Sequence, residues 1–292
     1  MIVSQLNIRM KKMLKHIRSK VKRHPRLSKY LFPLYVNFLH LRWKIRNLIT
    51  LHRPISFSAA NINIKLYCNG QISENVYAGF EENERDFVSS YLRPGMCLID
   101  VGANIGLYTV TASALVGKTG AVHAFEPSAS TFKLLLRNIE LNSCGNVILN
   151  KLALSDLNET MVLRADPLNP SYDGHRFVQK RSAVGTILET DEIIECTTLD
   201  AYASKLEIID FMKVDVEGAE LMVFKGSTKI LERTDAPMIM FECNVNGDEV
   251  ANFLSHYGYN FFLWDADNKI LRPSSFKEAI GGNIFAKKAN RF

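Results

Sequence analysis

The feature that most constrains this chain is a glycine turn that directly follows an apolar segment. Residues 97–101 are mostly apolar, Gly102 and Gly106 follow them, and residues 107–115 continue as a stretch typical of a helix. Only glycine combines left-handed backbone angles with room for a ligand against the main chain. A strand, a glycine turn and a helix in this order predict a binding site for a nucleoside cofactor.

A second element supports this prediction and specifies the cofactor. Glu126 lies 20 residues after Gly106, at the end of the next apolar segment, where an acidic side chain can accept both ribose hydroxyls. The dinucleotide fingerprint requires a second glycine where Asn104 stands, and Asp100 suits an ammonium and a sulfonium better than a diphosphate. We therefore expect S-adenosylmethionine rather than NAD, with these binding residues: Asp100, Gly102, Asn104, Gly106 and Glu126.

The remaining pattern predicts one large α/β domain. Apolar strands alternate with helices at about residues 81–92, 128–142 and 219–232, which is typical of a mainly parallel sheet covered on both faces. Residues 260–264 and 283–286 are expected to form a closing hairpin. The five cysteines are scattered and contain no C-x-x-C pair, so neither a zinc site nor a disulfide framework is indicated.

Charge divides the chain into two parts. No Asp or Glu occurs before Glu74, whereas 15 Lys and Arg do, which leaves 21 Lys and Arg against 30 Asp and Glu in the rest. The spacing of apolar residues predicts a basic amphipathic helix within the first part. We therefore expect an N-terminal helical arm over residues 1–53 and a cofactor-binding domain over residues 54–292.

Three interpretations of the arm remain open. Its apolar side packs on the domain, or it lies on an anionic membrane surface, or it binds nucleic acid or directs the chain to an organelle. The apolar stretch at residues 30–39 contains Pro33 and Asn37 and is shorter than the roughly 20 apolar residues that span a bilayer. A cytoplasmic location is the prediction, and a peripheral membrane contact through the arm is one of the open interpretations. A nucleic-acid partner is not favoured, and no oligomeric state is predicted.

Candidate catalytic residues follow two further apolar segments. Asp215 and Glu217 come after residues 211–214, and Glu242 ends residues 237–242. Because the carboxyl ends of parallel strands face the ligand crevice, these carboxylates should meet there. Glu217 is the preferred general base, Asp215 a contact for the cofactor or the acceptor, and Glu242 a second candidate; a purely helix-stabilising role of Glu217 stays open. A divalent metal on these carboxylates is possible in principle but is not favoured.

Together these motifs resemble the FkbM family of methyltransferases. The resemblance rests on the glycine turn, the Glu126 segment, and the following matches: residues 153–156, residues 199–200 and the specific Lys-Val-Asp-Val-Glu-Gly-Ala-Glu run at 213–220. It implies a class I methyltransferase fold, whose seven-stranded, mainly parallel sheet has an antiparallel last strand. It also implies S-adenosylmethionine and O-methylation of a saccharide, glycolipid or natural-product hydroxyl.

Two other functions remain as alternatives. The basic arm leaves room for an RNA methyltransferase, and a membrane-associated adaptor without catalysis could use the same scaffold. A turn-rich segment at residues 166–176, which contains His175, is a candidate substrate loop.

Overall fold

The computed structural model describes residues 41, 54–59, 62–67, 81–165, 176–180, 183–243, 247–279 and 282–289. The chain divides into two compact units, Met1–Arg53 with Glu74–Ala78 and Pro54–Ser73 with Gly79–Phe292. Apart from Leu41, every described residue belongs to the second unit. The predicted arm and residues 166–175 of the predicted loop, including His175, therefore lie outside the described residues.

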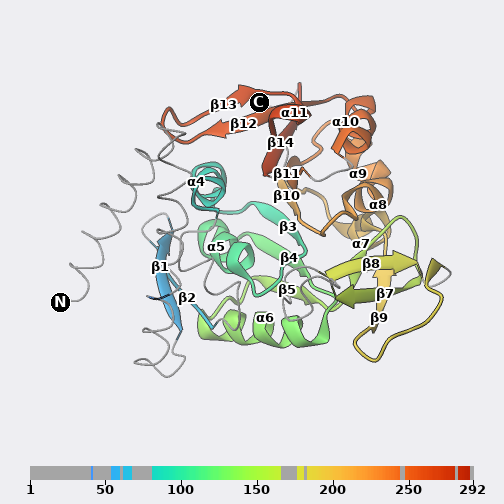
Figure 1. The fold of residues 1–292 in the computed structure, drawn as a ribbon. Coiled ribbons are helices and arrows are strands. Elements are labelled where there is room, and N and C mark those ends of the chain that lie inside the picture. Colours follow the sequence, from blue (N-terminus) through green and yellow to red (C-terminus); the bar gives the residue numbers. More distant parts are fainter. Residues whose placement is uncertain are drawn as a thin grey trace. The chain divides into compact units, whose positions relative to one another are not determined.

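The larger sheet of the described part has eight strands in the order β13-β12-β14-β11-β10-β3-β4-β5 (Figure 1). The five neighbouring strands β11, β10, β3, β4 and β5 run parallel to one another. Strand β14 is antiparallel to β11. Their bounds are Cys97–Val101 (β3), Ala121–Phe125 (β4), Val147–Asn150 (β5), Phe211–Val214 (β10), Met238–Glu242 (β11), Tyr259–Asp265 (β12), Ile270–Pro273 (β13) and Asn283–Lys288 (β14). This arrangement confirms the predicted class I methyltransferase fold with its antiparallel last strand.

The edge of the sheet differs from the prediction in two ways. β13 pairs with β12 and adds an eighth strand to the expected seven. β12 and β14 do pair in antiparallel fashion, but they are not a hairpin, because β13 and the short helix α11 (Phe276–Ala279) lie between them in the chain.

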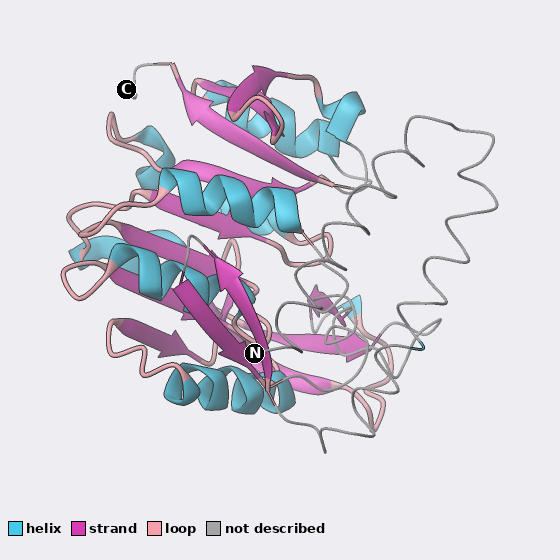
Figure 2. Ribbon diagram, turned by 90° about the vertical axis from the view of Figure 1, so that its left-hand side faces the viewer, coloured by secondary structure: helices cyan, strands magenta, loops and turns pink. Residues whose placement is uncertain are grey.

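Helices cover both faces of this sheet. Figure 1 places α4 and α5 on one side and α8, α9 and α10 on the other, and Figure 2 views the sheet from the α4 and α5 side. Adjacent residues of a strand point to opposite faces, so Leu98 packs with the α4 and α5 side chains while Ile99 packs with those of α8 to α10. The helices are α4 (Glu82–Tyr91), α5 (Leu107–Val116), α6 (Ala129–Leu141), α7 (Leu199–Tyr202), α8 (Glu220–Lys225), α9 (Thr228–Glu232) and α10 (Gly247–His256).

Two smaller sheets complete the described part. Between β5 and β10 the chain forms a four-stranded sheet in the order β6-β9-β7-β8. Its strands are Ala153–Leu154 (β6), Thr160–Ala165 (β7), Arg176–Lys180 (β8) and Glu192–Thr197 (β9). Before α4, β1 (Ile55–Ala59) and β2 (Ile62–Leu66) form an antiparallel pair.

Contacts with distant residues alter the local structure at two helices. The single helix expected over residues 219–232 is wrong, because α8 ends before Gly226, where a Cβ would lie 1.9 Å from the Ser155 carbonyl oxygen. Ser128 stands at the N-terminal cap of α6, but its hydroxyl makes no capping bond. That hydroxyl instead accepts a hydrogen bond from Arg176 Nη1 at 3.0 Å.

Asp200 caps α9 from outside the helix, which gives a test of the fold. Its carboxylate accepts hydrogen bonds from the backbone amides of Lys229 at 3.0 Å and Ile230 at 3.2 Å. We expect Asp200→Ala to lower the free energy of unfolding by about 1–2 kcal/mol, as loss of a helix cap does. Urea denaturation measures this change, and Glu189→Ala at an exposed position is the control. Equal stability of the two variants would contradict the capping role.

Candidate active site

The strands β4, β3, β10 and β11 end at about the same level of the sheet, so the residues at their carboxyl ends form one row. In the strand register, Val101 is paired with both Phe125 and Val214, and Val214 is paired with Phe241. The next residues along β4, β3, β10 and β11 are therefore neighbours, namely Glu126, Gly102, Asp215 and Glu242. This row lies at the carboxyl edge of the parallel strands, where open α/β sheets bind their ligands.

The glycine turn after β3 packs directly against the segment after β10. Gly102 has a φ of 75°, and a Cβ on it would lie 1.9 Å from the Asp215 carbonyl oxygen. Asn104 and Gly106 also have positive φ values, of 52° and 92°. A side chain at Gly102 would therefore push the glycine turn away from the segment after β10, so this position requires glycine.

Glu126 supports the same turn from the other side. Its Oε2 accepts a hydrogen bond from the Asn104 amide and its Oε1 from the Ser128 amide, each at 2.9 Å. Burial raises the pKa of Glu126 to about 7, although these two amides act in the opposite direction. Each carboxylate oxygen can accept a second hydrogen bond, so Glu126 retains the capacity to bind two ribose hydroxyls.

Asp100 lies inside the protein rather than on the crevice wall. It is fully buried, its Oδ2 accepts a hydrogen bond from Thr109 Oγ1 at 2.5 Å, and its Oδ1 lies 3.8 Å from Lys213 Nζ. Burial raises the pKa of Asp100, while Lys213 and Thr109 lower it. Direct contact between Asp100 and a cofactor thus stays a prediction, whereas its contact with Lys213 is observed.

Lys213 contacts both the glycine turn and a candidate catalytic residue. It was not among the site residues predicted from the sequence. Its Nζ lies 3.1 Å from Asp215 Oδ2 and 3.4 Å from the Gly102 carbonyl oxygen, although the residue is only 3% exposed. Burial disfavours its charge, but Asp215, Asp100 and Glu81 outweigh that effect and raise the pKa of Lys213. A lysine within an apolar strand was the available signal, because a buried ammonium needs partners.

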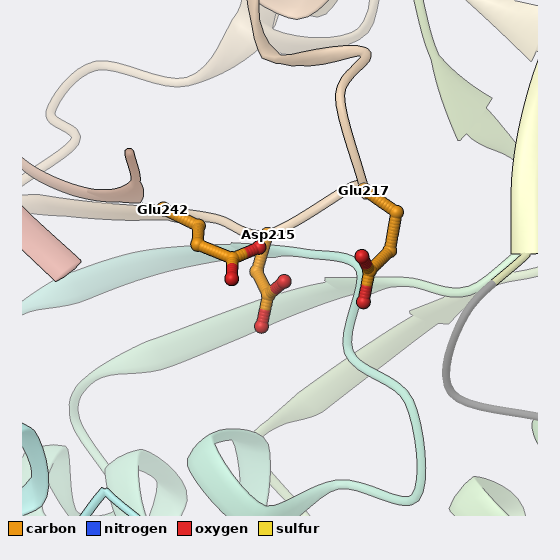
Figure 3. Close-up of side chains that lie close together, drawn as sticks. All are labelled: Asp215, Glu217 and Glu242. Carbon is orange, nitrogen blue, oxygen red and sulfur yellow. The ribbon is translucent and has the colours of Figure 1, made fainter. Parts of the chain in front are cut away.

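The three predicted catalytic carboxylates do come together. One oxygen from each of Asp215, Glu217 and Glu242 lies within 4.8 Å of the others. Figure 3 shows the three side chains directed toward the same region, from the segment after β10 and from the end of β11. Carboxylate oxygens also suit Mg²⁺, so this set is the candidate metal group of the described residues. The ammonium of Lys213 already forms an ion pair with one of these carboxylates, that of Asp215.

Glu217 has the properties of a base that works near neutral pH. Its backbone is left-handed, with a φ of 53°, and the residue lies outside α8. Burial, together with Asp215, Glu242 and Glu220, raises the pKa of Glu217 to about 8, and Lys213 opposes this rise. Glu220 differs, since its Oε1 accepts a hydrogen bond from the Gly218 amide at 3.1 Å and supports the loop.

Proteins with curated descriptions are similar to part of the chain. A hexuronic acid methyltransferase of Haloferax volcanii is 28% identical over 158 residues, which cover 54% of this chain and 61% of that protein. Methyltransferase 1 of Beauveria bassiana is 27% identical over 143 residues, or 44% of this chain and 57% of that protein. The chain thus spans about 60% of the length of these relatives.

A solved structure and a family model also match. Methyltransferase FkbM from Methylobacillus flagellatus aligns with a TM-score of 0.43 at 14% identity, over 75% of this chain and 56% of that one. The model of the methyltransferase FkbM domain matches residues 100–261, more than half of the chain, and includes the glycine turn and all three carboxylates. The chain therefore belongs to the FkbM methyltransferase domain family.

Proposed function

We propose that this protein is an S-adenosylmethionine-dependent O-methyltransferase that acts on a hydroxyl of a saccharide, glycolipid or natural product. The observation that carries the proposal is the row of strand ends. Glu126 stands on one side of the glycine turn, and Asp215 with Glu217 follows the strand on the other side. A cofactor held at the turn thus places its reactive end beside a base. Membership of the family and the name of the Haloferax relative support a saccharide acceptor.

The residues at the turn fit this cofactor. The glycine turn leaves the main chain accessible, Glu126 has free acceptor capacity for a ribose, and the nearby carboxylates complement a ligand with positive charges. We assign cofactor contacts to Gly102, Asn104, Gly106 and Glu126. Asp100 supports the turn through Lys213, because its oxygens face inward.

The chemistry requires alignment and removal of one proton. S-adenosylmethionine supplies a methyl group on a sulfonium, which an acceptor oxygen can take in an in-line displacement. Glu217 accepts the proton of the acceptor hydroxyl while the new carbon–oxygen bond forms and the carbon–sulfur bond breaks. Asp215, held by Lys213, and Glu242 orient the acceptor from the two neighbouring strands. A base near neutral pH makes a bound metal unnecessary in this proposal.

Glu126→Gln tests the cofactor assignment. The variant keeps one acceptor oxygen but loses the charge, so we expect S-adenosylmethionine to bind about 10- to 100-fold more weakly in calorimetry. Because the wild-type carboxyl has a pKa of about 7, affinity should also fall as the pH decreases below 7 and the carboxylate is protonated. Glu140→Gln, on the exposed side of α6, is the matched control. Undiminished binding by Glu126→Gln would remove Glu126 from the site.

Glu217→Gln tests the base. The wild-type rate should increase with pH through about 8 and level off above it, since only the deprotonated carboxylate accepts a proton. We expect the variant to lose this dependence and about 10²- to 10⁴-fold in rate, while exposed Glu232→Gln behaves as wild type.

The assay for Glu217 uses methyl-labelled cofactor and a panel of methyl glycosides that includes a glucoside, a galactoside and a glucuronide. A parallel reaction with EDTA separates the base from a metal. If EDTA abolishes activity and Glu217→Gln keeps the wild-type pH profile, a bound metal rather than Glu217 activates the acceptor hydroxyl.

We further propose that the basic arm over residues 1–53 associates with anionic membranes. The positive charge of the arm, which contains no Asp or Glu, carries this proposal. Separately, none of the helices that the structure describes could span a membrane. Full-length protein should float with anionic liposomes. A variant with Lys11, Lys12 and Lys15 all replaced by Gln should float less, because each lysine near an anionic surface contributes about 1 kcal/mol of binding free energy. The matched control replaces three exposed lysines of the domain, Lys118, Lys151 and Lys225. Equal flotation of both triple variants would contradict the proposal.

A further inference from the structure

Glu81 reaches the crevice although it lies outside every motif of the sequence. It directly precedes α4, with a left-handed φ of 51°, and its Oε1 accepts a hydrogen bond from Asn283 Nδ2 at 2.7 Å. Asn283 is the first residue of β14 and is paired with Glu242 in the strand register. Glu81 and Asn283 therefore lie at the same edge of the sheet as the catalytic carboxylates. Both are outside residues 100–261, which the family model matches.

Glu81 is electrostatically coupled to the catalytic residues. Burial and Asp215 together raise the pKa of its carboxyl to about 7, and Lys213, Asn283 and Tyr108 oppose this rise. The residue is nevertheless partly exposed. A carboxyl with one anchored oxygen and partial exposure can still accept a hydrogen bond from a ligand.

Asn283 has an unused acceptor beside this carboxyl. The residue is 9% exposed, and among the described residues its buried Oδ1 has no hydrogen-bond partner. Buried polar atoms in native proteins are nearly always paired, so an orphaned oxygen indicates a missing donor such as a ligand hydroxyl or a water molecule. Glu81 and Asn283 thus offer acceptors to a ligand that carries hydrogen-bond donors.

The sheet order places this pair on the acceptor side of the crevice. From β4, which Glu126 follows, to β14 there are four strand spacings, or about 19 Å between strand axes. Asn283 instead lies beside Glu242, its partner in the strand register, so an acceptor bound next to Glu217 and Glu242 is adjacent to this pair.

We propose that Glu81, anchored by Asn283, binds the acceptor by accepting a hydrogen bond from a hydroxyl next to the one that is methylated. The inference rests on the proposed function and narrows its substrate class to polyols with a free neighbouring hydroxyl, as saccharides have. Glu81 then determines specificity without taking part in the transfer.

Glu81→Gln tests this assignment in the full-length protein. Gln keeps the oxygen that Asn283 contacts but removes the charge, and exposed Glu82→Gln in the next position is the control. The acceptor is the glycoside of the panel that wild type methylates most efficiently. We expect KM for this glycoside to rise about 10- to 100-fold, with kcat within about threefold and S-adenosylhomocysteine affinity unchanged in calorimetry.

A deoxy analogue makes the test specific. Removal of the hydroxyl next to the methylated oxygen should raise KM of the wild type by a similar factor and should add little to the Glu81→Gln effect, because both changes break the same bond. Asn283→Ala should raise KM in the same direction.

Two results would overturn the assignment of Glu81. An unchanged KM would remove Glu81 from the acceptor site, and an equal loss of S-adenosylhomocysteine affinity would assign it to the cofactor. If wild type binds S-adenosylhomocysteine but methylates no glycoside, the proposed acceptor class fails instead, and this inference with it.

Discussion

The active edge of this protein depends on one buried ammonium. Lys213 lies in the centre of the sheet and contacts Asp100 at the end of β3, the Gly102 carbonyl in the glycine turn, and Asp215 after β10. An unpaired buried charge costs several kcal/mol, so Lys213 needs these partners, and they are held at fixed distances around it. The same contacts therefore set the position of the glycine turn relative to the segment that carries the proposed base.

The close contact between Gly102 and the Asp215 carbonyl adds a steric constraint to this electrostatic one. The glycine turn and the segment after β10 therefore meet with no side chain between them. The strand register also brings Glu126 and Glu242 to the same edge of the sheet. Distances across the crevice thus follow from the backbone of four adjacent strands rather than from flexible loops. A rigid frame of this kind suits an in-line transfer, which needs alignment more than covalent chemistry.

The parts of the site that were predictable are those encoded within one strand and its following turn. Gly102, Asn104 and Glu126 form a local pattern, and Asp215 and Glu242 follow apolar strands whose carboxyl ends must meet. Glu81 and Asn283 were not predictable, because their meeting depends on β14 running antiparallel beside β11. The need for a glycine at position 226, between α8 and α9, likewise comes from a distant carbonyl, that of Ser155, and β13 is an addition at the sheet edge. Sequence patterns reveal contacts along the chain, whereas these contacts depend on sheet order.

The carboxylates around Lys213 have a consequence for the charge balance of turnover. In the proposed reaction Glu217 gains a proton as the positive charge of the sulfonium is lost, so the total charge of the crevice is the same before and after transfer. The neighbouring carboxylates therefore contribute little to the activation free energy of the transfer, because the net charge near them does not change. Electrostatic work is confined to the arrival of the charged cofactor and to the later release of the proton from Glu217, so ionic strength acts on binding and on recovery of the free enzyme rather than on transfer.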